Sequence, residues 1–253
     1  MPGPAPGPAS GPASGSERPS DRRGAVRTGV VWAALQPLVT TAPLDVVDIG
    51  GGTGGLAVRI AALGHRVTVI DPSPDALAAL DRRARDAGVA VAGEQGDLAS
   101  LADRTASADL VLCHGVLEVA GDPAQALAVL AGSLRAGGAL SLLVAQRHAA
   151  VIARAMAGHF GQALALLDST APTGRAGVRF TAAELEELVA GAGLDAIALQ
   201  GVRVFADLVP GSLLDLEPGA TAALLELEHA VATRPEYRPL AAQLHLLARR
   251  RGR

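Results

Sequence analysis

The residues best suited to chemistry in this chain are glycines that follow a carboxylate. Asp48 precedes Gly50, Gly51, Gly52 and Gly54. The run comes directly after the apolar, β-branched stretch 45–49, which predicts an inner strand, and before 56–63, whose spacing predicts a helix. Glycines between a strand and a helix expose backbone N–H groups that a Cβ would shield from a ligand. The turn therefore predicts a binding site.

Two further carboxylates follow the next two predicted strands. The apolar stretch 65–70 ends in Asp71, about 20 residues after the first glycine of the turn. An acid at that place can accept hydrogen bonds from both hydroxyls of an adenosine ribose. Another acid, Asp97, stands before Leu98 and follows the predicted strand 89–93. These three segments together predict a site for a nucleoside cofactor.

The pattern of glycines bears on which nucleoside binds. Gly50, Gly52 and Gly55 satisfy the spacing of the dinucleotide fingerprint, which alone is weak evidence for a nicotinamide cofactor. The stretch 48–54 also reads Asp-x-Gly-x-Gly-x-Gly, which resembles motif I of class I methyltransferases, and Asp97 stands where those enzymes place an acid near the adenine. We therefore expect S-adenosylmethionine as cofactor, ahead of a nicotinamide and ahead of a glycine turn that binds nothing.

The composition of the 253 residues restricts the class of protein further. Hydrophobic residues make up 49%, which indicates a packed globule, and the net charge of −3 gives no global attraction to nucleic acid. Cys113 is the only cysteine and the six histidines are scattered, so we predict no disulfide and no metal site. No stretch is long and apolar enough to span a membrane. Residues 1–24 are rich in Pro, Gly, Ala and Ser, which predicts a disordered tail and, without a signal peptide, a cytoplasmic protein.

The elements that must position these residues alternate between strand and helix. This alternation predicts an α/β fold: a Rossmann-like, seven-stranded, mostly parallel sheet with helices on both faces and a reversed last strand, in one domain over residues 25–250. A ligand of such a sheet binds at the carboxyl ends of the strands, where the glycine turn, Asp71, Asp97 and His114 all fall. The expected strands are 45–49, 65–70, 89–93, 108–114, 139–145, 196–199 and 242–247. The expected helices are 26–39, 56–63, 74–87, 123–134, 151–167, 185–190 and 221–231, with a capping box from Thr181 to Glu184 and a loop over 168–179.

Several segments carry a closer resemblance. Gly201-Val202-Arg203-Val204-Phe205, the helix segment 224–228, and the stretches 114–118, 157–160, 235–237 and 244–245 are similar to the bacterial tRNA 5-carboxymethoxyuridine methyltransferases. The resemblance covers roughly residues 25 to 250. It implies transfer of a methyl group from S-adenosylmethionine to a carboxylate on the wobble uridine of certain tRNAs, giving a methyl ester. Carried over residue by residue, the family's cofactor contacts fall on Arg27, Gly51, Gly52, Asp71, Asp97, Leu98 and His114.

The chemistry of that reaction sets the expected roles of the remaining residues. A carboxylate is already ionised at neutral pH, so we expect no catalytic base and a mechanism that rests on proximity and alignment. An arginine would hold the anionic acceptor, with Arg203 the first candidate and Arg147 and Arg179 behind it. His114 and His148 would serve as base only if the acceptor were a hydroxyl or an amine.

Two alternatives stay open at the level of the sequence. The loop 168–179 holds two arginines where the resembling family has a lysine-rich loop, so a small-molecule methyltransferase on the same fold is the first alternative. A non-enzymatic protein that uses the cofactor fold to bind a partner is the second. The apolar stretch 151–167 fits either a core helix or a dimer face, and the oligomeric state is not predicted.

Overall fold

Two apolar segments form the centre of the sheet in the computed structural model, which describes residues 19–40, 42–172, 177–214 and 219–252. Strand β1 (Asp45–Ile49) pairs in parallel with β4 (Ala108–His114), and both have the predicted bounds. Strand β2 (Arg66–Asp71) lies beside β1, and β5 (Leu134–Ala145) lies beside β4, both in parallel. Most side chains of β1 and β4 are buried, as expected of inner parallel strands.

The complete sheet has seven strands in the order β3-β2-β1-β4-β5-β7-β6. Strands β3 (Ala92–Gln95) and β6 (Leu194–Val202) form its edges, and β7 (Gln243–Arg250) is antiparallel to both β5 and β6. Since β7 reverses against both neighbours, β6 runs parallel to β5. The carboxyl ends of β1, β2, β4, β5 and β6 therefore meet at one edge of the sheet, which we call the carboxyl edge. This confirms the predicted seven-stranded sheet with a reversed last strand.

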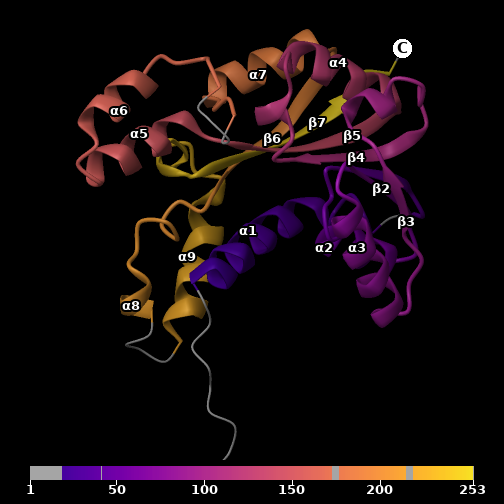
Figure 1. Cartoon of the computed structure of the whole chain (residues 1–253), viewed down its shortest axis with the longest axis horizontal. Coiled ribbons are helices and arrows are strands. Elements are labelled where there is room, and N and C mark those ends of the chain that lie inside the picture. The colour runs from indigo at the N-terminus through magenta and orange to yellow at the C-terminus, as the bar shows by residue number, and fades with distance from the viewer. Residues whose placement is uncertain (1–18, 41, 173–176, 215–218, 253) are drawn as a thin grey trace, which may run out of the picture.

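Helices cover both faces of the sheet (Figure 1). One face carries α1 (Pro19–Leu35), α2 (Gly55–Ala61), α3 (Pro74–Asp86) and α9 (Ala220–Ala232). The other carries α4 (Pro123–Ser133) and α7 (Ala182–Gly191), which begins at the predicted Thr181–Glu184 capping box. A pair of helices, α5 (Arg147–Met156) and α6 (Phe160–Leu166), follows the end of β5, and the short α8 (Gly211–Leu214) precedes α9. Short 3₁₀ turns are η1 (Leu98–Leu101), η2 (Leu117–Val119) and η4 (Arg238–Leu240).

The structure corrects several predicted bounds. Helix α1 begins at Pro19, so residues 19–24 of the predicted tail are helical, while 1–18 lie outside the described residues. The predicted helix 151–167 is two helices, because Gly158 takes the left-handed conformation (φ 75°) between them. Strand β3 lies later than the predicted 89–93, because Val89 closes the end of α3 by donating to Ala84 O.

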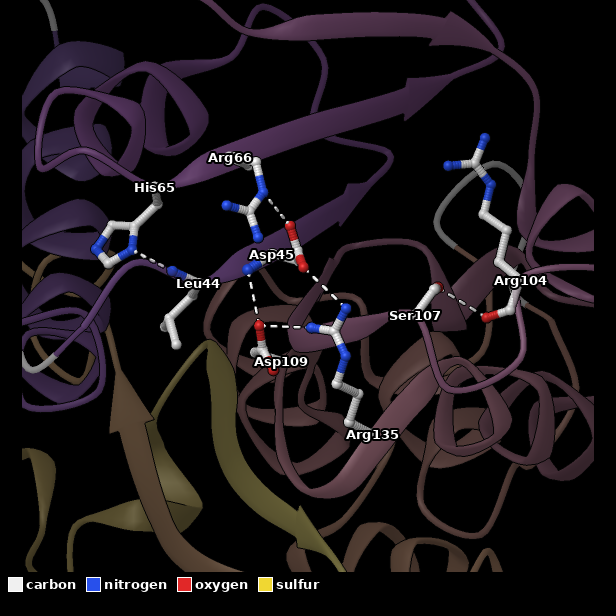
Figure 2. A network of polar contacts seen from close by, with 8 residues as sticks. All are labelled: Leu44, Asp45, His65, Arg66, Arg104, Ser107, Asp109 and Arg135. Atoms are coloured by element: carbon white, nitrogen blue, oxygen red, sulfur yellow. Dashed lines mark hydrogen bonds and ion pairs between the residues drawn. The ribbon is translucent and has the colours of Figure 1, made fainter.

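The amino ends of the strands carry an ion-pair network (Figure 2). Asp45 accepts from Arg66 at 2.6 Å and from Arg135 at 2.8 Å, and Arg135 also lies 2.6 Å from Asp109. The hydrogen bonds from Arg66 and then Arg135 lower the pKa of Asp45 to about 2. This network joins β1, β2, β4 and β5 at the edge opposite the glycine turn, so it serves the fold. Among the described residues no helix is long and apolar enough to cross a membrane.

Candidate functional site

The glycine turn between β1 and α2 is shaped by two different requirements. Gly50, Gly52 and Gly54 all have φ between 56° and 73°, a region that residues with a Cβ rarely adopt. A Cβ on Gly51 would lie 2.5 Å from the Asp48 Oδ2, so packing against this carboxylate excludes a side chain there. A Cβ on Gly52 would meet nothing within 4 Å. The open space above Gly52 is therefore not filled by the protein itself.

Asp71, at the end of β2, is tied to this turn. Its Oδ2 accepts the N–H of Gly52 and its Oδ1 accepts the N–H of Ser73, both at 2.9 Å. A carboxylate has about four acceptor positions, so each oxygen keeps one for a ligand. Asp71 lines a cavity of about 730 Å³ together with Asp97 and Leu98. Asp97 is held there as the N-cap of η1, where it accepts from Ala99 at 2.9 Å.

A second, smaller and more polar cavity of about 330 Å³ adjoins the turn, with Gly50, Gly51 and Gly55 in its lining. Arg27 and Thr28 of α1 line it, together with Asp48 and Arg83. Gly50 and His114 line both cavities, so the two spaces meet at the ends of β1 and β4. The site thus consists of two adjoining cavities: Asp71 lines the larger one, and the oppositely charged Arg27 and Asp48 line the smaller one, which we call the charged half.

The charged half is buried enough to shift the ionisation of its members. Burial raises the pKa of Asp48 to about 7, although Arg27 acts in the opposite direction. Burial and then the charge of Arg203 lower the pKa of Arg27, whereas Glu118 and Asp48 raise it. Arg203 directly follows β6, so the parallel run of this strand brings it to the same edge as the glycine turn. Arg27, Arg203 and Glu118 are therefore neighbours at the carboxyl edge.

Comparison with known proteins shows the family to which this chain belongs. A family described as a methyltransferase domain matches residues 47–140. The tRNA 5-carboxymethoxyuridine methyltransferase of Escherichia coli (strain K12) is 31% identical over 244 residues, which cover 90% of this chain and 89% of that protein. The chain belongs to the class I S-adenosylmethionine-dependent methyltransferases. The predicted enzyme class and cofactor are thereby confirmed.

This methyltransferase is also similar to a solved structure and to a second group of enzymes. A solved SAM-dependent methyltransferase from Methanosarcina mazei is 16% identical with a TM-score of 0.58, and the match covers 87% of this chain and 98% of that one. That likeness confirms the predicted fold class. The ubiquinone biosynthesis O-methyltransferase of Xanthomonas axonopodis pv. citri (strain 306) is 34% identical over 134 residues, which cover 53% of this chain and 54% of that protein.

His114 of the methyltransferase is the end of a buried chain of hydrogen bonds. Its Nε2 lies 2.9 Å from the Ser141 hydroxyl, which lies 2.8 Å from the His245 Nε2. A hydroxyl has one proton, so at least one imidazole must donate to it. Burial, then His245 and Arg27, lower the pKa of His114 well below its ordinary value, which leaves the ring neutral at pH 7. Sequence reasoning missed Ser141, because nothing near it in the sequence points to the two histidines.

The other candidate base and one candidate arginine lie elsewhere. His148 is exposed on α5 and is not among the described residues that line the two cavities; Gln146, not His148, caps this helix by accepting from Ala149. Arg147 pairs with both oxygens of Glu184 at 2.8 and 2.9 Å and lines a third cavity of about 620 Å³, which shares Gly121 and Asp122 with the largest one but has no lining residue from the glycine turn. The structure therefore does not bring Arg147 or His148 to the glycine turn.

Glu118 is the functional candidate that sequence reasoning left without a role. It is buried; its Oε1 accepts the N–H of Ala145 at 2.8 Å and its Oε2 has no hydrogen-bond partner in the described part of the chain. Burial raises its pKa, whereas Arg27 and Arg179 act to lower it. Arg179 is thus near the charged half, and burial followed by Arg154 lowers the pKa of Arg179. Among the described residues no group of three His, Cys, Asp or Glu could hold a metal.

Proposed function

We propose that this methyltransferase transfers the methyl group of S-adenosylmethionine to the carboxylate of 5-carboxymethoxyuridine at the wobble position of tRNA. The observation that carries the proposal is Arg203, which stands beside Arg27 at the carboxyl edge and within the segment 201–205 that resembles the tRNA-modifying family. The similarity to the Escherichia coli enzyme covers 90% of the chain, so it includes the second half as well as the cofactor half. Action on tRNA would place the enzyme in the cytoplasm.

The two cavities divide the cofactor between them in this proposal. The larger one would hold adenosine, with Asp71 accepting from the ribose hydroxyls and Asp97 and Leu98 beside the adenine. The smaller one would hold the methionine end, with its carboxylate on Arg27. Gly50, Gly51, Gly52 and Gly54 keep the turn clear of side chains, while Asp48 offers negative charge near the positive sulfonium and ammonium groups.

The protein's part in catalysis is then mainly orientation. The bound cofactor supplies a methyl group on a sulfonium, which a nucleophile can displace in line. An ionised carboxylate is a nucleophile without losing a proton, so the neutral His114 is not required as a base. Arg203 would hold the acceptor carboxylate, with the neighbouring Arg179 adding positive charge. Orientation of two bound reactants can lower a barrier by about 7–11 kcal/mol in well-aligned cases.

A small-molecule acceptor is the second candidate function. The cavity of about 620 Å³ between α4 and α7 is mostly apolar, with Val178, Phe180 and Leu188 among its lining residues. The partial similarity to ubiquinone biosynthesis O-methyltransferases favours the same alternative. A hydroxyl acceptor would need a base, which distinguishes this candidate from a carboxylate acceptor.

Mass spectrometry of tRNA nucleosides from a deletion strain tests the proposal. We expect the methyl ester of 5-carboxymethoxyuridine to disappear and the unmethylated nucleoside to accumulate. Complementation with the wild-type gene should restore the ester, and complementation with an Arg203→Ala variant should not. An unchanged nucleoside profile in the deletion strain would remove tRNA as the substrate and leave the small-molecule candidate.

A further inference from the structure

The turn that follows β6 holds Arg203 in an unfavourable backbone conformation. Its φ is 59°, in the left-handed region, and among the described residues only Ala106 shares this combination of a side chain and a positive φ. Strain of this kind persists only where the surroundings fix it, and it gathers at functional sites. The Arg203 carbonyl accepts the N–H of Ala242 at 3.0 Å, which fixes one side of the residue.

Glu228 of α9 fixes the other side. Its carboxylate accepts three consecutive backbone N–H groups at 2.8 Å: Val204 on Oε2, and Phe205 and Ala206 on Oε1. Glu228 is fully buried, with 0% of its surface exposed. A buried carboxylate with three donors is well compensated, and removing any of these bonds would leave buried polar groups unsatisfied. The side chain of Glu228 therefore attaches residues 204–206, just after Arg203, to α9; we call these three hydrogen bonds the Glu228 clasp.

The side chain of Arg203 is only partly satisfied by the protein. One terminal nitrogen lies 2.9 Å from Asp207, while the buried Nε has no hydrogen-bond partner in the described part of the chain. Its charge also stands close enough to Arg27 to lower the pKa of that residue. Two neighbouring guanidinium groups repel each other, and Asp207 beside Arg203, together with Glu118 and Asp48 near Arg27, offsets part of this repulsion. A further anion, such as the carboxylate of a ligand, would offset more of it.

We propose that Glu228 is a positioning residue for the methyl acceptor: it clasps residues 204–206 and thereby holds Arg203 against the acceptor carboxylate. This inference rests on the proposed function, because it takes Arg203 as the acceptor-binding residue. It also accounts for a feature of the sequence, since the segments 201–205 and 224–228 that resemble the tRNA-modifying family contact each other through this clasp.

A purely structural role for Glu228 predicts a different pattern of effects. If the clasp only attached α9 to the sheet, its loss would weaken folding and cofactor binding alike. If it positions Arg203, its loss should impair use of the acceptor and should have no further effect once Arg203 is gone. Non-additivity of the two substitutions is therefore the decisive readout.

The experiment combines Glu228→Gln, Arg203→Ala and the double variant, with Glu226→Gln on the exposed side of α9 as the matched control. Calorimetry measures S-adenosylmethionine affinity, and methyl transfer to tRNA containing 5-carboxymethoxyuridine gives kcat/KM. We expect each single variant to lose roughly 10- to 100-fold in kcat/KM, because a charged hydrogen bond of that strength is lost. Cofactor affinity should stay unchanged, and the double variant should be no worse than Arg203→Ala.

The other outcomes overturn the proposal or separate it from the proposed function. Losses that multiply in the double variant, cofactor binding that weakens with kcat/KM in Glu228→Gln, or normal transfer by Arg203→Ala would each refute the positioning role. If wild-type enzyme does not methylate this tRNA, the proposed function fails, and a crystal structure of Glu228→Gln decides the clasp: Arg203 should leave the left-handed region, and its retention there would contradict us. Should this variant not fold, Glu228→Asp, with its shorter carboxylate, takes its place in the same measurements.

Discussion

Asp48 should make the cofactor-free enzyme lose stability as the pH rises. Only 4% of its surface is exposed, and burial raises its pKa from an ordinary value of 3.8 to about 7. Between these two values the folded protein binds more protons than the unfolded chain, so unfolding becomes easier as the pH rises. Below pH 3.8 the carboxyl is protonated in both states, and above pH 7 the loss is complete.

The size of the effect follows from the shift of the pKa. Each unit corresponds to about 1.4 kcal/mol, so the full cost of ionising Asp48 in the folded protein is roughly 4 kcal/mol. Between pH 5 and pH 8 the part that is lost amounts to about 2–3 kcal/mol. An asparagine at this position has nearly the same shape and no charge, so Asp48→Asn should be free of this cost.

Urea unfolding of cofactor-free wild type and Asp48→Asn at pH 5 and pH 8, at one ionic strength, measures the difference. We expect the variant to gain about 2–3 kcal/mol relative to wild type over this range, because all other titrating groups cancel in the comparison. The variant should also bind S-adenosylmethionine less well. Weaker binding would show that the Asp48 carboxylate lowers the stability of the folded protein but contributes to cofactor affinity. Parallel stability curves for the two proteins would refute the reasoning.

Three further outcomes are expected. Asp71→Ala should weaken S-adenosylmethionine binding roughly 10- to 100-fold in calorimetry, because the ribose loses a charged acceptor; unchanged affinity in a folded variant would sink this assignment. Gly52→Val should abolish cofactor binding, whereas Gly64→Val, also at a positive φ with open space around it, should be destabilised without losing binding; equal affinities in the two variants would argue against a ligand over Gly52. With saturating cofactor and a carboxylate acceptor, kcat should stay flat from about pH 6 to 9, and a rise that disappears in His114→Ala would indicate a hydroxyl or amine acceptor instead.

The fold was predictable where the hydrophobic pattern of a segment matches its burial in the folded protein. Strands β1 and β4 have mostly buried, apolar interiors because both faces of the sheet are covered by helices, so their bounds follow from the sequence. Strand β3 lies at the edge of the sheet and has mostly exposed residues, so its sequence lacks the apolar pattern of a buried strand. The apolar Val89 nearby closes the end of α3 instead, which is why the predicted strand begins too early. The sequence predicts one helix where α5 and α6 form, because a single glycine such as Gly158 does not show from the sequence whether it ends a helix.

The site was predictable where residues lie next to strand ends, and not where distant side chains pair. The glycine turn, Asp71 and Asp97 converge because parallel strands end at one edge. Arg147 was an acceptor candidate, but it pairs with Glu184, a residue 37 positions away whose sequence signal is a helix cap. The contacts of Glu228 with the turn after Arg203 span 22 to 24 positions, and no periodicity in either segment indicates them.

Methyl transfer in vitro tests the central claim most directly. Purified enzyme, S-adenosylmethionine labelled on the methyl group, and tRNA with or without 5-carboxymethoxyuridine are incubated, and the labelled tRNA is then treated with mild base. We predict label only on the tRNA that carries the carboxylate, and its release by base, because a methyl ester hydrolyses where methylated oxygen ethers, amines and carbons do not. Base-stable label, or no transfer by enzyme that binds the cofactor, would contradict carboxylate methylation of tRNA.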